Sequence, residues 1–247
     1  MSSLATQSRL ADTMSERLRR MLSGPDEEIS LVEAALLIAS HGYPDLNVAA
    51  YLSRIEELAH MLRMRIGEDA TTQERIADLN QFLFGDLGFA ANSEDYYDPR
   101  NSFINEVLER GICIPITLSV IYMELCRKIV QPLQGVSFPG LFLVKCAVAD
   151  GAVVLDPYFV GISLGLQDLQ KRLLDVRGGE VSRAIVAELL VSASNKEIIV
   201  RLLRNLQAIY RRERDRDKAL PIMTWSVANL PKPAAELLDR RMTYTER

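Results

Sequence analysis

The stretch RGICIPITLSVIY, residues 110–122, decides the fold of this chain. Pro115 suits the first turn of a helix, because that turn leaves its N–H groups unpaired and proline has none. Apolar side chains then recur at helical spacing, at Leu118, Ile121, Tyr122, Leu125 and Ile129. Such a helix is apolar nearly all round, which is typical of a helix buried in a core. Cys113 lies two residues ahead of the proline, so the sequence also raises the question of a nucleophile at a helix N-terminus.

The segments on either side of this helix indicate an α+β fold. Residues 140–148 and 152–155 are rich in Val and Leu and are joined through Asp150-Gly151, a strong hairpin signal. We therefore expect an antiparallel sheet containing residues 141–147 and 152–156. The region from 28 to 110 has helical periodicity, shown by the stripe Tyr51, Ile55, Leu58 and Leu62. Together these patterns predict at least six helices and a small sheet.

Two further breaks organise the helical region. Tyr43-Pro44-Asp45 is expected to interrupt the chain and cap the next helix, and a third helix is expected from Thr71-Thr72 to the glycines at 85–88. The first residues, 1–25, have no continuous apolar core and are expected to form a mobile or weakly helical leader. We expect residues 26–192 to hold the helical region and the core, and residues 193–247 to pack on it.

Composition narrows the class of protein. The 247 residues are 48% hydrophobic and 25% charged, which is ordinary for a globular protein. Three cysteines without CxxC spacing argue against a zinc site or a disulfide framework, and no cofactor or metal is expected. No apolar run reaches the ~18 residues that a membrane span needs. The expectation is a cytoplasmic protein that does not bind membranes.

The distribution of charge argues against nucleic acid as a partner. Lys and Arg counted against Asp and Glu give −11 for residues 26–110, 0 for 111–200 and +5 for 201–247. A protein that binds DNA or RNA more often has a dominant basic face. Solvated helix faces explain both charged zones, although the two ends of the chain could also attract each other.

Four motifs in a fixed order carry a resemblance. They are NSEDYYDPRNSFINEVLER at 92–110, IPITLSVIYMELCRK at 114–128, GVSFPGLFLVK at 135–145 and LDPYF at 155–159. In this order they resemble the core of the SirB-type branch of the transglutaminase-like superfamily, over roughly residues 30 to 245. In active members the resemblance implies a Cys at the start of the buried helix, a His on the next strand and an Asp on the strand after. The helix would favour a thiolate, the His would move a proton and the Asp would orient the His.

This sequence matches only one member of that triad. Asp156 closes the second strand of the hairpin, as the resemblance requires. The nucleophile position falls on Pro115, with Cys113 two residues earlier, and the histidine position is Leu141, which cannot carry a proton. The histidines of the chain, His41 and His60, lie in the acidic helical region.

Two functions therefore remain open. The favoured one is a non-catalytic protein that binds a protein or peptide partner through a degenerate cleft and repeat-like helices at the C-terminal end. The alternative is a cysteine-dependent amide hydrolase or acyl transferase that uses Cys113 and Asp156 with a displaced base. Cys126 and Cys146 are interpreted as core residues. The oligomeric state is left open.

The segment before the next helix has two interpretations. Asp98 or Asn101 can cap exposed N–H groups after the break at Pro99, which makes this a capping loop. Alternatively, Tyr97, Asp98, Arg100 and Asn101 line the cleft and bind a peptide or a polar ligand.

The C-terminal zone resembles tetratricopeptide helices. Leu203, Leu206 and Tyr210 would belong to a first helix and Ala219, Met223 and Ser226 to a second, which Pro231 closes. Leu237 and Tyr244 repeat Leu203 and Tyr210 after 34 residues. Because about three repeats are needed for a free-standing solenoid, these helices are expected to pack on the core.

Overall fold

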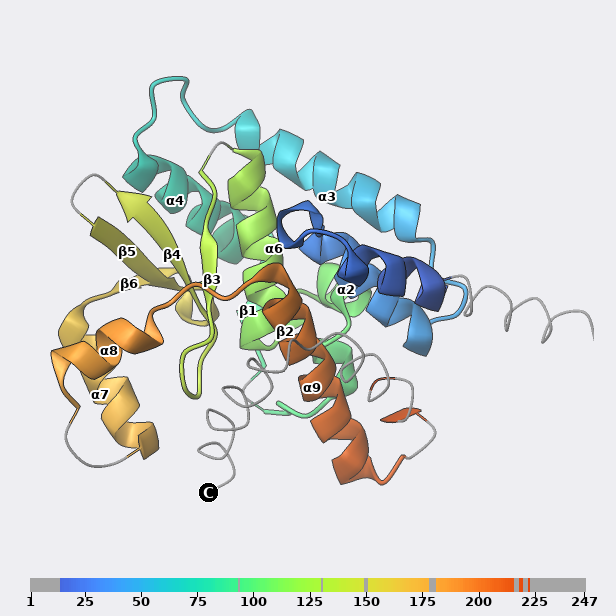
Figure 1. Cartoon of the computed structure of the whole chain (residues 1–247). Coiled ribbons are helices and arrows are strands. Elements are labelled where there is room, and N and C mark those ends of the chain that lie inside the picture. Colours follow the sequence, from blue (N-terminus) through green and yellow to red (C-terminus); the bar gives the residue numbers. More distant parts are fainter. Residues whose placement is uncertain are drawn as a thin grey trace, which may run out of the picture.

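The computed structural model describes residues 14–92, 94–129, 131–148, 151–177, 181–215, 218–219 and 222. Helix α6 (Pro115–Lys128) runs through the middle of the molecule. On one side of it lies a four-stranded sheet, with α7 (Leu166–Arg177) and α8 (Arg183–Leu189) beyond it; on the other lie α2 (Leu31–Gly42), α3 (Val48–Arg63) and α9 (Asn195–Glu213) (Figure 1). The predicted α+β fold, with at least six helices and a small antiparallel sheet, is confirmed.

The N-terminal helices begin at side-chain caps. Ser30 caps α2, Asn47 caps α3, and Thr71 forms a capping box with Glu74 at the start of α4 (Thr72–Asn80). Each cap supplies an acceptor to an N–H group that the first turn leaves unpaired. Asn47, the N-cap of α3, thus lies two residues after the segment Tyr43-Pro44-Asp45 that the sequence predicts as the cap.

Helix α4 continues into a π-helical turn, Gln81–Asp86, and the chain then reverses at Gly88, whose φ is +69°. The helix expected from Thr71-Thr72 to the glycines is therefore present. The apolar stripe of α3 is also present, with Ile55, Leu58 and Leu62 buried and Tyr51 half-buried.

Part of the segment expected to be a leader lies among the described residues. Residues 14–23 form a helix, in agreement with the helical form of that expectation. Its Leu18 and Leu22, four residues apart, form one apolar side of the helix and are buried in the core.

Helix α6 is buried, as its sequence predicts. It starts with Pro115 in the first turn, and its side chains from Ile116 to Met123 are all buried. Before it, α5 (Ile104–Arg110) ends at Gly111, which has φ +70°. The chain then forms β2 (Ile112–Cys113), which pairs in parallel with β1 (Ala90–Ala91). This pairing brings the start of α6 beside the segment that follows the π-helical turn.

The main sheet is an antiparallel meander in the order β3 (Gln134–Val136), β4 (Leu143–Val148), β5 (Gly151–Asp156) and β6 (Ile162–Leu164). The predicted hairpin is β4 with β5, in which Val144 pairs with Leu155 and Val148 with Gly151. Asp150 itself lies outside the described residues. One sheet face packs in the cluster that contains α6, and the other packs on Leu169 and Leu173 of α7.

Helix α9 is tied to the start of the fold. Ser194 and Glu197 form a capping box, and the Asp26 carboxylate accepts from the backbone N–H groups of Asn195 and Lys196 at 2.8 and 2.9 Å. Leu203, Leu206 and Tyr210 are buried, so the first repeat-like helix packs on the core. Ala219 is buried as well. Met223, Ser226, Pro231, Leu237 and Tyr244 lie outside the described residues, and the tetratricopeptide assignment stays a prediction.

Candidate functional site

Asp156 ends strand β5 and is completely buried. Its carboxylate accepts a hydrogen bond from the backbone N–H of Tyr158 at 3.1 Å and forms an ion pair with Arg172 of α7. The short helix η4 (Pro157–Phe159) that Asp156 caps packs against α6. The partners of this carboxylate are thus a backbone N–H and an arginine. The residue therefore joins the sheet to α6 and α7.

Cys113 is completely buried in β2. Its Sγ donates to the backbone carbonyl of Ala90 at 3.2 Å, and burial raises the pKa of the thiol to about 12. A thiol in this environment is protonated at neutral pH, and the thiolate is the nucleophilic form. Neither of the other two cysteines is exposed: Cys126 and Cys146 are also buried, as expected for core residues.

Leu141, at the position where the resemblance places a histidine, contacts an arginine through its backbone. The backbone carbonyl of Leu141 accepts from the Nη2 of Arg201 on α9 at 3.0 Å, and the same guanidinium lies 5.5 Å from the ring centre of Phe142. His60 is exposed on α3, and His41 lies in the last turn of α2, near Lys218. Position 141 thus carries no histidine side chain, and its backbone contacts a guanidinium.

The loop at 95–101 is held by its own polar side chains. Asp98 caps the short helix η3 (Pro99–Asn101) by accepting from the N–H of Arg100 at 2.9 Å, which confirms the expected capping role. Its carboxylate also pairs with the Arg100 side chain at 2.7 Å and lies 3.8 Å from Arg110. Asn101 is completely buried and donates to the carbonyl of Asp95 at 2.7 Å. These bonds fix the loop without using its aromatic side chains.

Those aromatic side chains are exposed. Tyr96 and Tyr97 are 42% and 47% exposed, and their rings meet edge to face with centres 5.4 Å apart. Arg212 of α9 lies 4.2 Å from the ring centre of Tyr97, within reach of a cation–π interaction. Between the loop and α9 is a shallow pocket of about 530 Å³, lined among others by Arg100, Ile209 and Arg212. We call Tyr96, Tyr97, Arg100 and Arg212 the tyrosine–arginine surface.

Tyr158 lies between the tyrosine–arginine surface and Asp156, since both Tyr96 and Asp156 are near its side chain. Tyr158 donates from its hydroxyl to the carbonyl of Asn92 at 3.1 Å, and its ring lies edge to face with Phe159 at 5.7 Å. Burial raises the pKa of Tyr158, and the nearby Tyr96, Cys113 and Asp156 add to this effect. The sequence predicts Tyr97 and Arg100 as candidate binding residues. It gave no sign of Arg201 or Arg212, which lie about a hundred residues further along the chain.

No metal centre is apparent in the part of the chain that the structure covers, where no three His, Cys, Asp or Glu side chains group in a way that could hold an ion. Among the same residues, no helix is both long and apolar enough to cross a membrane.

A match over most of the described fold defines the class of protein. Residues 49–204 match the transglutaminase-like superfamily, and the chain belongs to that superfamily. Its relatives include a UPF0162 protein of Xylella fastidiosa (strain 9a5c), 39% identical over 223 residues that span 90% of this chain and 79% of the relative. A UPF0162 protein of Pseudomonas aeruginosa is 33% identical over 74% of this chain and 66% of its own length.

A more distant similarity extends to a human protein. F-box only protein 21 of Homo sapiens is 26% identical over 79% of this chain, and the matched region covers 35% of that protein. No solved structure matches the chain.

Proposed function

We propose that this protein is a non-catalytic transglutaminase-like protein of the SirB-type branch, which acts in the cytoplasm by binding a protein or peptide partner. The tyrosine–arginine surface would make the contact, with α9, the first of the tetratricopeptide-like C-terminal helices, supplying Arg212. The observation that carries this proposal is the burial of Cys113 and Asp156, both completely inaccessible.

The surroundings of Cys113 and Asp156 support a structural role for both residues. A nucleophile has to reach its substrate as a thiolate, whereas Cys113 is buried, donates to a backbone carbonyl and has a raised pKa. The Asp156 carboxylate, which would orient a histidine, is bonded to Tyr158 and Arg172. The alternative, a cysteine-dependent amide hydrolase or acyl transferase, would need both residues to leave these partners.

The tyrosine–arginine surface has the properties of a recognition site. Tyrosine and arginine, with tryptophan, are the residue types enriched where binding energy concentrates. Tyrosine offers a large contact area with few rotatable bonds, and the arginine guanidinium is a planar group that stacks on aromatic rings. Asp98 and Asn101 hold the loop through bonds to its backbone, so little ordering is needed on binding. Two neighbouring tyrosines, Tyr96 and Tyr97, stay almost half exposed beside this loop.

A purification with matched variants tests the proposal. The tagged protein is isolated from its own cells, co-purifying proteins are identified by mass spectrometry, and each candidate is purified and titrated by calorimetry. Tyr97→Ala and Arg212→Ala should weaken binding by about tenfold or more, as expected for central contacts. Met64→Ala, which changes a 76% exposed side chain on another part of the surface, should leave it unchanged.

The enzyme alternative is tested on the same samples. The proposal predicts no amide hydrolysis or acyl transfer by wild type on peptides of the partner. Turnover that Cys113→Ala abolishes would establish the alternative, and partner binding that tolerates both Tyr97→Ala and Arg212→Ala would remove the tyrosine–arginine surface from the proposal.

A further inference from the structure

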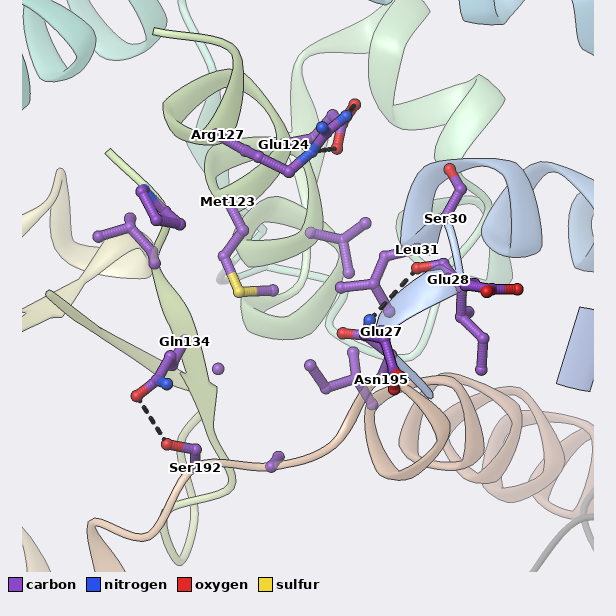
Figure 2. A pocket seen from close by; sticks show the side chains of 17 residues that line it. Glu27, Glu28, Ser30, Leu31, Met123, Glu124, Arg127, Gln134, Ser192 and Asn195 are labelled. Atoms are coloured by element: carbon purple, nitrogen blue, oxygen red, sulfur yellow. Dashed lines mark hydrogen bonds and ion pairs between the residues drawn. The ribbon is translucent and has the colours of Figure 1, made fainter. Parts of the chain in front are cut away.

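A separate cavity of about 420 Å³ lies where the N-terminal turn η1 (Asp26–Glu28), α6, β3 and the start of α9 meet (Figure 2). It shares no lining residue with the tyrosine–arginine surface. Its wall is fixed by Asn195, whose side chain donates to the backbone carbonyls of Asp26 and Ile29 at 2.9 and 3.3 Å. We call this the η1 cavity.

The floor of the η1 cavity is apolar. Val120 and Ile198 are buried, and Met123 projects from α6 toward the middle of the cavity in Figure 2. Leu133, only partly buried, adds to the same floor. A methionine side chain is flexible and polarisable, so it can adapt to an inserted aliphatic chain.

Most polar groups around this floor already have partners. Gln134 and Ser192 hydrogen-bond to each other at 2.8 Å. Glu124 bonds to Arg127 at 2.8 and 3.0 Å and lies 3.4 Å from Lys128. Burial acts to raise the pKa of Glu124, but the bonds from Arg127 and the two positive charges outweigh it and lower the pKa. Glu124 is therefore an ionised carboxylate that its neighbours neutralise.

Two further carboxylates at the cavity are different. Glu27 and Glu28 line it from η1, both are exposed, and neither forms an ion pair with another residue among those described. The η1 cavity thus combines an apolar floor with two carboxylates that form no ion pair within the described part of the chain. The stretch 26–110 has a net charge of −11, which adds a longer-range attraction for cations.

We propose that the η1 cavity binds a lysine or arginine side chain from a basic, partly apolar polypeptide segment. Such a side chain lays its aliphatic stem along apolar surface and keeps its charged head in water. Here the stem lies on Met123 and Leu133, and the head meets Glu27 and Glu28. The commitment to a polypeptide rests on the charge of Glu27 and Glu28, which complements a basic segment, and on the volume of about 420 Å³, which leaves space beside one inserted side chain.

Fluorescence anisotropy tests this proposal independently of the tyrosine–arginine surface. The probe is a fluorescein-labelled octapeptide of alternating lysine and leucine, and its glutamate-for-lysine counterpart is the negative probe. The double variant Glu27→Gln/Glu28→Gln should bind the basic peptide roughly tenfold more weakly, since two exposed ion pairs of modest strength are lost. Asp26 is left unchanged because it caps α9.

The control is a variant that loses the same number of negative charges at a site away from the η1 cavity. Glu68→Gln/Asp69→Asn neutralises two exposed carboxylates between α3 and α4 and should bind the peptide within about twofold of wild type. Met123→Trp, which fills the η1 cavity without changing charge, should also weaken binding, and circular dichroism melting identifies any variant that fails to fold. Equal loss in the Glu68/Asp69 variant, or no loss in the Glu27/Glu28 and Met123 variants, overturns the proposal. Spermidine that displaces the peptide at equal concentration also overturns it, because the site would then take small amines.

Discussion

Removing the Asp156 carboxylate should destabilise the fold even though no substrate reaches it. Asp156→Ala takes away the partner of Arg172 and the acceptor for the Tyr158 N–H. Leaving one member of a buried ion pair without its partner costs about 3–5 kcal/mol. The Arg172 side chain is 23% exposed and can recover part of its hydration, so we expect about 3 kcal/mol. Asp156→Asn keeps an acceptor for Tyr158 and loses only the charge, so about 1–2 kcal/mol is expected.

Urea unfolding followed by circular dichroism measures both variants, and a double-mutant cycle isolates the ion pair. Arg172→Met removes the guanidinium while keeping most of the side-chain volume. In that background Asp156→Ala should cost at least about 1 kcal/mol less than in wild type, because no arginine is left unpaired. Equal costs in the two backgrounds, or a loss below about 1 kcal/mol for Asp156→Ala in wild type, would refute this structural account of Asp156.

Three other residues give further expectations. Native protein at pH 8 should leave Cys113 unlabelled by iodoacetamide until it is unfolded, and rapid native labelling would contradict its burial. The pKa of the Cys113 thiol rises from 9.0 to about 12 on folding, so the stabilisation that the buried, protonated thiol provides is complete below pH 9 and is lost as the pH approaches 12. Between these pH values the unfolding free energy of Cys113→Ala should therefore fall less steeply than that of wild type. Asn101→Ala should cost about 1–3 kcal/mol and speed hydrogen exchange at residues 95–98, whereas unchanged exchange would show that the loop is held otherwise. Leu141→His should create no amide hydrolysis, since the thiol stays protonated at neutral pH, and measurable turnover would reverse that inference.

Local signals predicted most of the fold. Pro115 and the apolar run after it determine where α6 begins and why it is buried, and the turn before residue 152 predicts the β4–β5 hairpin. Asp156 could be placed at the end of its strand by the same reasoning. These features depend on residues close together in the sequence, where periodicity and turn chemistry act.

Features that depend on distant parts of the chain could not be predicted. The β1–β2 pairing involves two residues on each side, too few for a periodic pattern. The π-helical turn at 81–86 follows an ordinary helical pattern. For the candidate site, the partners Arg172, Arg201 and Arg212 come from α7 and α9, and only the packed structure brings those helices to Asp156, Leu141 and Tyr97.

The β1–β2 pairing has a consequence for how this protein can vary. It fastens residues 90–91 to 112–113, so the chain between them is a closed loop whose base belongs to the core. The entropy of closing a loop grows only with the logarithm of its length, so doubling the length costs roughly 0.6 kcal/mol. Residues inserted at the exposed position Glu94 would therefore hardly affect the packed core, and one scaffold could display recognition loops of many lengths.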